Sequence, residues 1–285
     1  MKNEPLVAIT GIDSGIGKSL CGVLAENGFA VAGSYLESNP FGENPRVHAF
    51  RMDARNEQDI SGFARYIGEL CAGGNHPLFG IVNNAGIALG GPVEETPLSV
   101  YREVFEVNYF ALVSFVQKML PLLREQRGRI FVVGSMAGRV ALPFLAPYAS
   151  SKYAVEGFCD SLRRETAQFG IRTVLFEPGG IATPIWSKAK EQDRSFISDR
   201  YRRSITLFEE KVIDSGIGGW PADLAARQMF RIMVKPHPLR RYVIDSKPLM
   251  EFLAGHLPAA LVDRFTAGSF ALRARKDLRR KRIAL

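Results

Sequence analysis

Long apolar runs, cysteines and histidines are all scarce in this chain of 285 residues. No run of about 18 apolar residues occurs, so no membrane-spanning helix is expected, and the chain starts without a signal-peptide pattern. The three cysteines, Cys21, Cys71 and Cys159, are odd in number and widely scattered. That spacing argues against a disulfide framework and favours a reducing compartment. We therefore expect a soluble, cytoplasmic protein.

Metal-ligand spacing is missing among the four dispersed histidines, so no metal site is predicted. The net charge of +8 is concentrated at one end, because residues 273–285 hold seven basic residues and one acid and carry +6 of it. The rest of the chain lacks the basic footprint of a nucleic-acid binder, and no nucleic-acid partner is expected. An acidic membrane surface, an acidic subunit or RNA could bind such a basic tail, but a solvated end of the chain explains it more simply.

The order of apolar and amphipathic segments predicts one doubly wound parallel α/β sheet, Rossmann-like, in a single domain covering 1–285. No repeat or linker divides the chain. The irregular stretch at about 183–220 interrupts the alternation and is predicted to be an active-site lid. The expected strands are Leu6–Thr10, Ala30–Tyr35, Val47–Met52, Phe79–Asn83, Arg129–Gly134, Arg172–Glu177 and Arg241–Asp245. The expected helices are Ile16–Asn27, Gln58–Cys71, Leu98–Glu125, Pro147–Phe169 and Ala222–Val234.

A glycine-rich turn follows the first strand, with glycines at Gly11, Gly15 and Gly17, and opens a helix. Glycines in that position let the backbone approach a pyrophosphate at the positive end of the helix. A P-loop is the rival interpretation because Lys18 and Ser19 follow, but that motif requires a glycine where the chain has Ile12. The turn therefore favours a dinucleotide.

Two more loops follow strands that belong to the same predicted sheet. Asp53 comes after the third strand and has the chemistry to accept a hydrogen bond from an adenine amine, and 83–86 ends the fourth strand with small residues. Either loop alone could be an ordinary turn. Together they would line one edge of the sheet, which is where ligands bind in such folds.

Tyr148 and Lys152 lie four residues apart in a predicted helix, so their side chains share one face. A free phenol has a pKa of about 10, and proton transfer near neutral pH requires a downward shift of about 3 units, or about 4 kcal/mol. One cation about 4 Å away can supply much of that at an effective dielectric of about 20. A chance pair on an exposed helix is the alternative. We expect the pair to lower the pKa of the phenol.

Several motifs together resemble the short-chain dehydrogenase/reductase family over nearly the whole chain. They are Thr10-Gly11-x-x-x-Gly15-x-Gly17, Asn83-Asn84-Ala85-Gly86, Asn108, Ser135, Tyr148-x-x-x-Lys152 and Pro178-Gly179. Ile9–Gly15, Gly138–Ala141, Asp160–Glu165 and Phe176–Gly179 are similar to the retinol, hydroxysteroid and 3-hydroxybutyrate dehydrogenase branch. The resemblance implies hydride transfer between a nicotinamide and a secondary alcohol or ketone.

The same resemblance assigns four catalytic residues. Tyr148 would exchange a proton with the substrate oxygen, and Lys152 would lower its pKa and hold the nicotinamide ribose. Ser135 would bind the substrate oxygen, and Asn108 would fix a water that relays protons to Lys152. The implied cofactor-binding residues are Gly11, Asp13, Ser14, Gly15, Ile16, Gly17, Tyr35, Leu36, Asp53, Ala54, Asn84, Ala85, Gly86, Tyr148, Lys152, Pro178, Gly179, Ile181 and Thr183.

The end of the second strand selects between NAD and NADP in this fold, through an acid for NAD or an arginine for NADP. Tyr35 and Leu36 occupy those positions here, so neither charge is present. Glu37 would repel a phosphate, and a leucine resembles NAD-using members of the branch. We expect NAD, with NADP as the alternative.

Apolar side chains in the segment after Ser135 and in the proposed lid predict a hydrophobic alcohol or ketone as substrate, although packing explains most of them equally well. Basic lid residues could bind an acidic group, but a solvated face is simpler. By resemblance, helices 98–125 and 147–169 would form the interface of a homodimer or homotetramer. A catalytically silent dinucleotide sensor or scaffold, and a lyase or epimerase on the same fold, are the alternative functions.

Overall fold

A seven-stranded parallel sheet organises the computed structural model, which describes residues 4–74 and 76–272. The strand order is β3-β2-β1-β4-β5-β6-β9, the doubly wound order of dinucleotide-binding folds extended by one strand. All seven predicted strands are confirmed. Their bounds are Leu6–Ile9 (β1), Ala30–Tyr35 (β2), Val47–Arg51 (β3), Leu78–Asn83 (β4), Arg129–Val133 (β5), Arg172–Pro178 (β6) and Arg241–Ile244 (β9).

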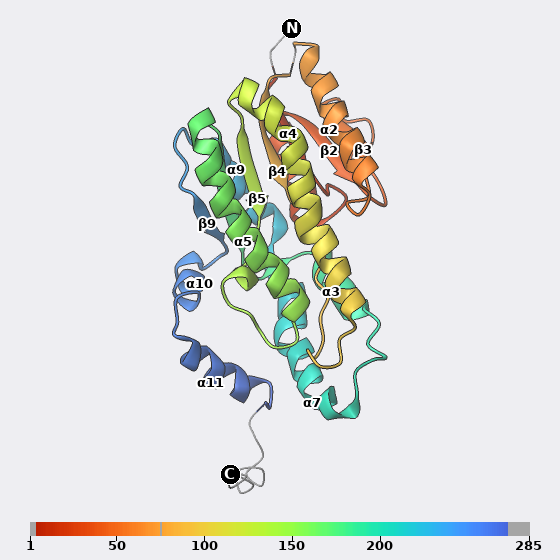
Figure 1. Cartoon of the computed structure of the whole chain (residues 1–285), viewed down its shortest axis with the longest axis vertical. Coiled ribbons are helices and arrows are strands. Elements are labelled where there is room, and N and C mark those ends of the chain that lie inside the picture. The colour runs from red at the N-terminus through yellow and green to blue at the C-terminus, as the bar shows by residue number, and fades with distance from the viewer. Residues whose placement is uncertain (1–3, 75, 273–285) are drawn as a thin grey trace, which may run out of the picture.

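Helices cover both faces of the sheet because each has one apolar face that must be buried. One core lies between the sheet and α2, α4 and α5, which stand in front of the strands in Figure 1. The other core lies between the sheet and α1 and α9. The bounds are Gly15–Glu26 (α1), Glu57–Ala72 (α2), Leu98–Phe105 (α3), Ala111–Gln126 (α4), Ala146–Thr166 (α5) and Ala222–Met233 (α9).

The predicted continuous helix 98–125 is interrupted by a π-helical turn at Glu106–Phe110, which separates α3 from α4. Buried Asn108 sits at the centre of this turn. A π turn inserts an extra residue into the helical ladder and often marks a functional site. The sequence pattern could not show it, because the apolar periodicity continues across the turn.

The predicted lid is helical, so the expectation of an irregular segment at 183–220 is wrong. It contains α6 (Pro184–Glu191), α7 (Asp199–Phe208), a π turn (Glu209–Ile213) and α8 (Asp214–Ile217). The lid ends are joined by the short strand pair β7 (Ile181–Ala182) and β8 (Trp220–Pro221). A third apolar cluster, which includes Phe144, Ile205 and Phe208, packs the lid onto the segment that follows β5.

After β9 the chain forms α10 (Pro248–Ala254) and α11 (Ala259–Ser269), which lie along one edge of the molecule in Figure 1. The predicted basic tail 273–285 lies outside the described residues. Among the helices that the structure describes, none combines the length and apolar character needed to cross a bilayer.

Candidate active site

The glycine turn and the loop after β4 are tied together at the carboxyl edge of the sheet. Thr10 Oγ1 accepts hydrogen bonds from the backbone N–H groups of Asn84 (3.0 Å) and Ala85 (3.1 Å). Asn84 Nδ2 donates to the carbonyl oxygens of Thr10 (3.0 Å) and Gly11 (2.8 Å). Because β1 and β4 are neighbours and the chain reverses direction across the sheet here, this is the switch point where such folds bind ligands.

Gly17 shows why the turn requires glycine. An ideal Cβ on Gly17 would lie 1.9 Å from the Gly11 carbonyl oxygen and 2.3 Å from Asn84 Nδ2. Gly15 has φ of +56° and packs against Thr183, whose Cβ would be 3.1 Å from an added Cβ. The predicted residue Thr183 therefore lies over the glycine turn.

The positive N-terminal end of α1 has neither a side-chain cap nor an acidic residue in its first turn. Its N-cap, Ser14, makes no side-chain cap hydrogen bond, and the first turn contains no acid. The first turn of α2 differs, since Asn56 caps it and it carries Glu57 and Asp59. A free positive helix end beside a close-packed glycine turn suits an anionic pyrophosphate.

Asp13 and Asp53, both predicted to contact the cofactor, have protein partners. Asp13 Oδ2 accepts hydrogen bonds from the backbone N–H groups of Leu36 (3.1 Å) and Glu37 (3.3 Å), so it fastens the glycine turn to the end of β2. The Asp53 carboxylate pairs with Arg55 at 2.7 Å, and this hydrogen bond lowers the pKa of Asp53. The partnership of Asp13 was not evident from the sequence, because Asp13 and Leu36 are 23 residues apart.

Tyr148 and Lys152 share one face of α5, and Ser135 follows β5 beside them. Lys152 Nζ is buried, donates to the Val133 carbonyl oxygen at 3.0 Å, and lies 5.8 Å from the centre of the Tyr148 ring. Ser135 lies close enough to Tyr148 for its hydroxyl to act on the pKa of the phenol. The structure thus brings Ser135, Tyr148 and Lys152 together, and Asn108 lies near Lys152 across Gly86.

The predicted lowering of the Tyr148 pKa is wrong for this arrangement. Burial raises the pKa of the phenol, and the hydrogen bond from Ser135 opposes that rise without reversing it. Burial lowers the pKa of Lys152 to about 8. The ammonium bonds to a backbone carbonyl instead of to the phenol oxygen, so it does not dominate the phenol. Tyr148 keeps its proton at neutral pH and is suited to donate it.

Asn108 connects three elements around Lys152. Its Oδ1 accepts from the Ile87 N–H (2.9 Å), while its Nδ2 donates to the Ile87 carbonyl oxygen (3.0 Å) and to Ser151 Oγ (2.9 Å). Ser151 Oγ in turn donates to the Tyr148 carbonyl oxygen at 2.7 Å. Sequence reasoning missed Ser151, because nothing in the motif marks a serine beside the lysine. The side chain of Asn108 therefore positions α5 and the β4 loop.

The predicted lid, 183–220, is tied to the loop after β4. Gln192 makes two hydrogen bonds with the backbone of Gly90, at 3.0 Å each, and so fixes the lid to the loop after β4. Beside it lies a small apolar cavity of about 10 Å³, whose walls include Leu145, Ile205 and Phe208 but not Tyr148. Ion pairs engage five of the basic lid residues: Lys188 with Glu37, Lys190 with Asp214, Arg194 with Glu209, Arg200 with Glu94 and Arg202 with Asp199.

The remaining predicted cofactor residues surround the same edge of the sheet. Pro178 ends β6 and is buried, and Ile181 begins β7, which continues into the lid. Tyr35 and Leu36 end β2. Gly86 faces Asn108 and Lys152, since an ideal Cβ on it would lie 3.1 Å from Asn108 Oδ1 and 3.7 Å from Lys152 Nζ. Within 4–74 and 76–272, no three acidic, histidine or cysteine side chains are grouped closely enough to hold a metal ion.

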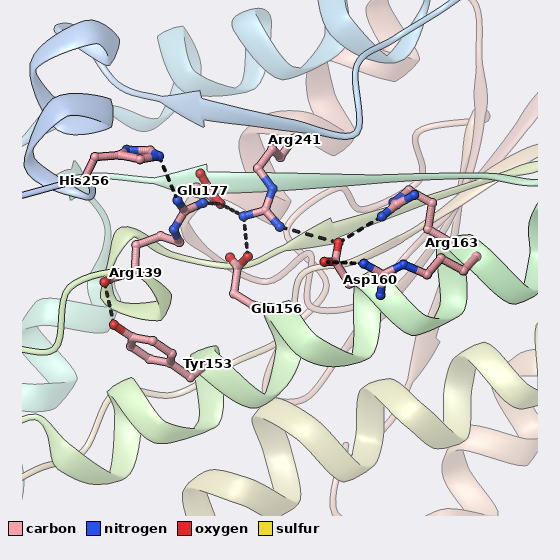
Figure 2. A network of polar contacts seen from close by, with 9 residues as sticks. Arg139, Tyr153, Glu156, Asp160, Arg163, Glu177, Arg241 and His256 are labelled. Atoms are coloured by element: carbon pink, nitrogen blue, oxygen red, sulfur yellow. Dashed lines mark hydrogen bonds and ion pairs between the residues drawn. The ribbon is translucent and has the colours of Figure 1, made fainter.

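A buried ionic network supports α5 behind the site (Figure 2). Arg241 from β9 pairs with Glu156 at 2.8 Å and with Glu177 at 3.0 Å, and Arg139, which follows the Ser135 turn, pairs with Glu177 at 3.3 Å. One Glu156 oxygen, Oε1, is buried without a hydrogen-bond partner. Burial, and secondarily the Glu177 carboxylate, raise the pKa of Glu156 to about 7. Sequence reasoning missed this network because its members come from four separate segments.

Replacing Glu156 with glutamine should flatten the pH dependence of stability. Since the folded pKa is raised from 4.5 to about 7, the folded state holds a proton that the unfolded state has lost, and stability falls as pH rises through that window. The unmodified protein should lose stability as the pH is raised from 5 to 8, and Glu156→Gln should not. Over that range, the difference in free energy of unfolding between the two proteins should therefore shift by about 1 to 3 kcal/mol in favour of the variant. Urea unfolding at several pH values measures it. Glu165→Gln, at an exposed position on the same helix, is the control, and equal slopes for all three proteins would contradict the assignment.

Comparison with known proteins agrees with this geometry. The family model described as short chain dehydrogenase matches residues 5–194. The NADPH-dependent 3-dehydrocapnine reductase of Ornithobacterium rhinotracheale is 34% identical over 90% of this chain and 94% of its own length. Retinol dehydrogenase 7 of Rattus norvegicus is 31% identical over 84% and 80%. A short chain dehydrogenase/reductase from Burkholderia phymatum, solved in complex with NAD, superposes with a TM-score of 0.76 at 20% identity, covering 93% of this chain and 96% of that one.

Proposed function

This chain belongs to the short-chain dehydrogenase/reductase family, and we propose that it reduces or oxidises a hydrophobic ketone or secondary alcohol through Ser135, Tyr148 and Lys152. The reaction class is that of its relatives, NAD(P)-dependent oxidoreductases that act on CH–OH groups. The observation that carries the proposal is the grouping of these three side chains beside the glycine turn, with Ser135 next to Tyr148 and Lys152 held by the Val133 carbonyl oxygen.

The nicotinamide supplies or accepts the hydride when it is bound. The chain's own residues handle the proton and the position of the substrate. Tyr148 donates its proton to the carbonyl oxygen as charge develops there, and Ser135 hydrogen-bonds the same oxygen. Lys152 supplies a positive charge behind the phenol, while Asn108 and Ser151 fix the helix that carries both. In the oxidative direction the proton moves the other way.

An apolar substrate is supported by the apolar cluster that contacts Tyr148 and by the ion pairs of the basic lid residues. Phe144 and Phe208 pack ring to ring at 5.8 Å in a cluster that also contacts Tyr148. The basic residues of the lid that could have bound an acidic substrate group are paired with carboxylates in five cases. Relatives named for retinol and for 3-dehydrocapnine are consistent with this class.

A screen of hydrophobic alcohols and ketones with NAD(H) and NADP(H), followed at the nicotinamide absorbance, tests the proposal. Turnover with an apolar ketone or alcohol supports it. Binding of cofactor without turnover of any compound favours a dinucleotide sensor or scaffold. Product formation without net change in the cofactor favours a lyase or epimerase on the same fold.

We expect NADH to bind more tightly than NADPH. The carboxylates of Asp13 and Glu37 lie at the end of β2, where they would repel the additional phosphate of NADPH, and Lys188 is paired with Glu37 at 3.0 Å. Fluorescence titration measures both affinities. Glu37→Gln should raise the NADPH affinity several-fold with little effect on NADH, whereas Glu43→Gln, on the exposed loop that follows, should change neither. Equal or reversed affinities in the unmodified protein would overturn the NAD assignment.

A homodimer or homotetramer assembled through α4 and α5 is also part of this proposal. Support comes from large side chains exposed next to or on these helices, including Phe110 (53% exposed) and Tyr153 (46%). A cytoplasmic location is part of it as well, because Cys21, Cys71 and Cys159 are all free thiols.

A further inference from the structure

A basic cleft opens at the amino edge of the sheet, between the ends of α4 and α5 and the loop that precedes β9. Its volume is about 820 Å³. Of the nine described residues that line it, none is acidic and four are arginines, namely Arg124, Arg127, Arg129 and Arg172. A cleft of this size can hold a small molecule, and its lining favours an anion.

This cleft is separate from the candidate active site. Arg129 and Arg172 begin the parallel strands β5 and β6, whereas Ser135 follows the other end of β5. Because β5 spans five residues, the two edges of the sheet are about 15 Å apart there. In Figure 1, α4 and α5 end at the top of the molecule, and α7 of the lid lies at the bottom. A ligand bound in the cleft would therefore not occupy the predicted cofactor site.

Backbone carbonyl groups hold two of the four arginines in place. Arg129 Nη1 donates to the carbonyl oxygens of Met233 (2.7 Å) and Lys235 (2.8 Å). Arg172 Nη1 donates to the carbonyl oxygen of Pro236. A guanidinium has five N–H donors in a fixed fork, so these bonds orient both side chains and leave donors for a ligand.

The four positive charges have no acidic partner among the side chains that the structure describes. None of the four guanidinium groups lies within 4 Å of a described carboxylate, whereas Arg163 and Arg164 on α5 both pair with Asp160. Burial, and secondarily the positive charge of Arg172, lower the pKa of Arg129. An anion between these groups would remove their mutual repulsion.

Helix capping explains only part of this cluster. Arg129 bonds carbonyl groups at the end of α9, which is an ordinary role for a cation. Arg124 lies over the Phe169 ring at 5.4 Å instead of bonding the last carbonyl groups of α4. Arg127 has φ of +51°, a conformation that glycine adopts at lower cost. Arg127 therefore lines the cleft at a position where the helix end itself would favour glycine.

We propose that this cleft binds a small anion with two or more phosphate groups, either an inorganic polyphosphate or the phosphate chain of a nucleotide. Guanidinium groups bind phosphate oxygens through paired N–H donors, and four of them supply more positive charge than one phosphate group requires. The concave shape favours a small molecule over the surface of an acidic protein. This inference does not rest on the proposed function.

Isothermal titration calorimetry of the full-length protein with tripolyphosphate tests the site. In about 0.05 M salt we expect a Kd below about 0.1 mM, and in about 0.5 M salt at least about tenfold weaker binding. Orthophosphate should also bind at least about tenfold more weakly, because it has fewer charges. ATP identifies the source of the phosphates: tighter binding than that of tripolyphosphate assigns the site to a nucleotide, and equal or weaker binding assigns it to the phosphate chain alone.

Arg124→Gln with Arg127→Gln should weaken the binding of tripolyphosphate at least about tenfold. Both side chains are exposed, so the fold should persist, and urea unfolding checks this. Arg65→Gln with Arg102→Gln is the matched control, because it removes the same charge at two exposed positions of α2 and α3 outside the cleft. The control protein should bind tripolyphosphate within about twofold of the unmodified protein.

Three results would overturn the proposal. The first is the absence of measurable tripolyphosphate binding to the unmodified protein while polyglutamate binds, which would assign the cleft to an acidic protein. The second is an unchanged affinity in the Arg124→Gln, Arg127→Gln protein, which would place the anion elsewhere, such as at the glycine turn. The third is an equal loss in the control protein, which would show that net charge alone attracts the anion. None of these measurements requires turnover, so they stand whether or not the proposed reaction is found.

Discussion

Tyr148→Phe should lower turnover by about a thousandfold while leaving cofactor affinity within about twofold of the unmodified protein. The phenol lies beside Ser135 and holds its proton at neutral pH, because burial raises its pKa. Removing the hydroxyl leaves the ring in the apolar cluster with Phe144 and Phe208, so packing is preserved. Turnover with a ketone found in the screen, and fluorescence titration of the cofactor, measure the two quantities.

Tyr153→Phe is the matched control for Tyr148→Phe. Tyr153 lies on the same helix, five residues further on, and its hydroxyl donates to the Arg139 carbonyl oxygen instead of facing Ser135. We expect its turnover to stay within about threefold of the unmodified protein. Near-normal turnover in Tyr148→Phe, or an equal loss in both variants, would remove Tyr148 from the role of proton donor.

Lys152 favours proton donation by the phenol in a different way from the one that the spacing suggested. A pKa of about 8 leaves the ammonium largely protonated at neutral pH, so a buried positive charge stands behind Tyr148. The Val133 carbonyl holds this charge at 3.0 Å. As the phenol gives up its proton, the growing negative charge is stabilised by that cation and by Ser135. The cation thus acts on the charged product of the step more than on the resting phenol.

The sequence predicted the sheet well because each strand and its following helix have their own local apolar pattern. All seven strands were found, and Ser135, Tyr148 and Lys152 came together because Ser135 follows a predicted strand and the other two share one face of a predicted helix. The roles assigned to these residues and to the cofactor loops stay predictions. The resemblance to a family, carried by motifs spread over the chain, was confirmed by the match to the short chain dehydrogenase model.

Features that depend on partners far apart in the sequence were beyond such reasoning. The π turn around Asn108 follows from its bonds to Ile87 and Ser151, 21 and 43 residues away. The lid is an exception, because Tyr201, Ile205 and Phe208 of α7 recur at helical spacing and indicate a helix from the sequence alone. The raised pKa of Tyr148 reflects burial by distant segments, which no spacing of four residues reports.

Gly17→Ala should abolish measurable cofactor binding, with a loss of at least about a hundredfold in affinity, and should destabilise the fold by about 1 to 3 kcal/mol. The added methyl group would meet the Gly11 carbonyl oxygen at 1.9 Å and Asn84 Nδ2 at 2.3 Å, so the glycine turn and the β4 loop must separate. That movement breaks the hydrogen bonds of Asn84 and shifts the helix end that faces the pyrophosphate.

Gly22→Ala on the same helix separates this effect from a general cost of replacing glycine. Its added methyl group would meet only Phe41, at 3.9 Å, which is ordinary contact, and alanine is the better helix former by about 1 kcal/mol. Gly22→Ala should therefore bind cofactor normally and unfold at a higher urea concentration, while Gly17→Ala unfolds at a lower one. Fluorescence titration and urea unfolding measure both variants. Normal cofactor affinity in folded Gly17→Ala would show that the close contact between the glycine turn and the β4 loop does not shape the dinucleotide site.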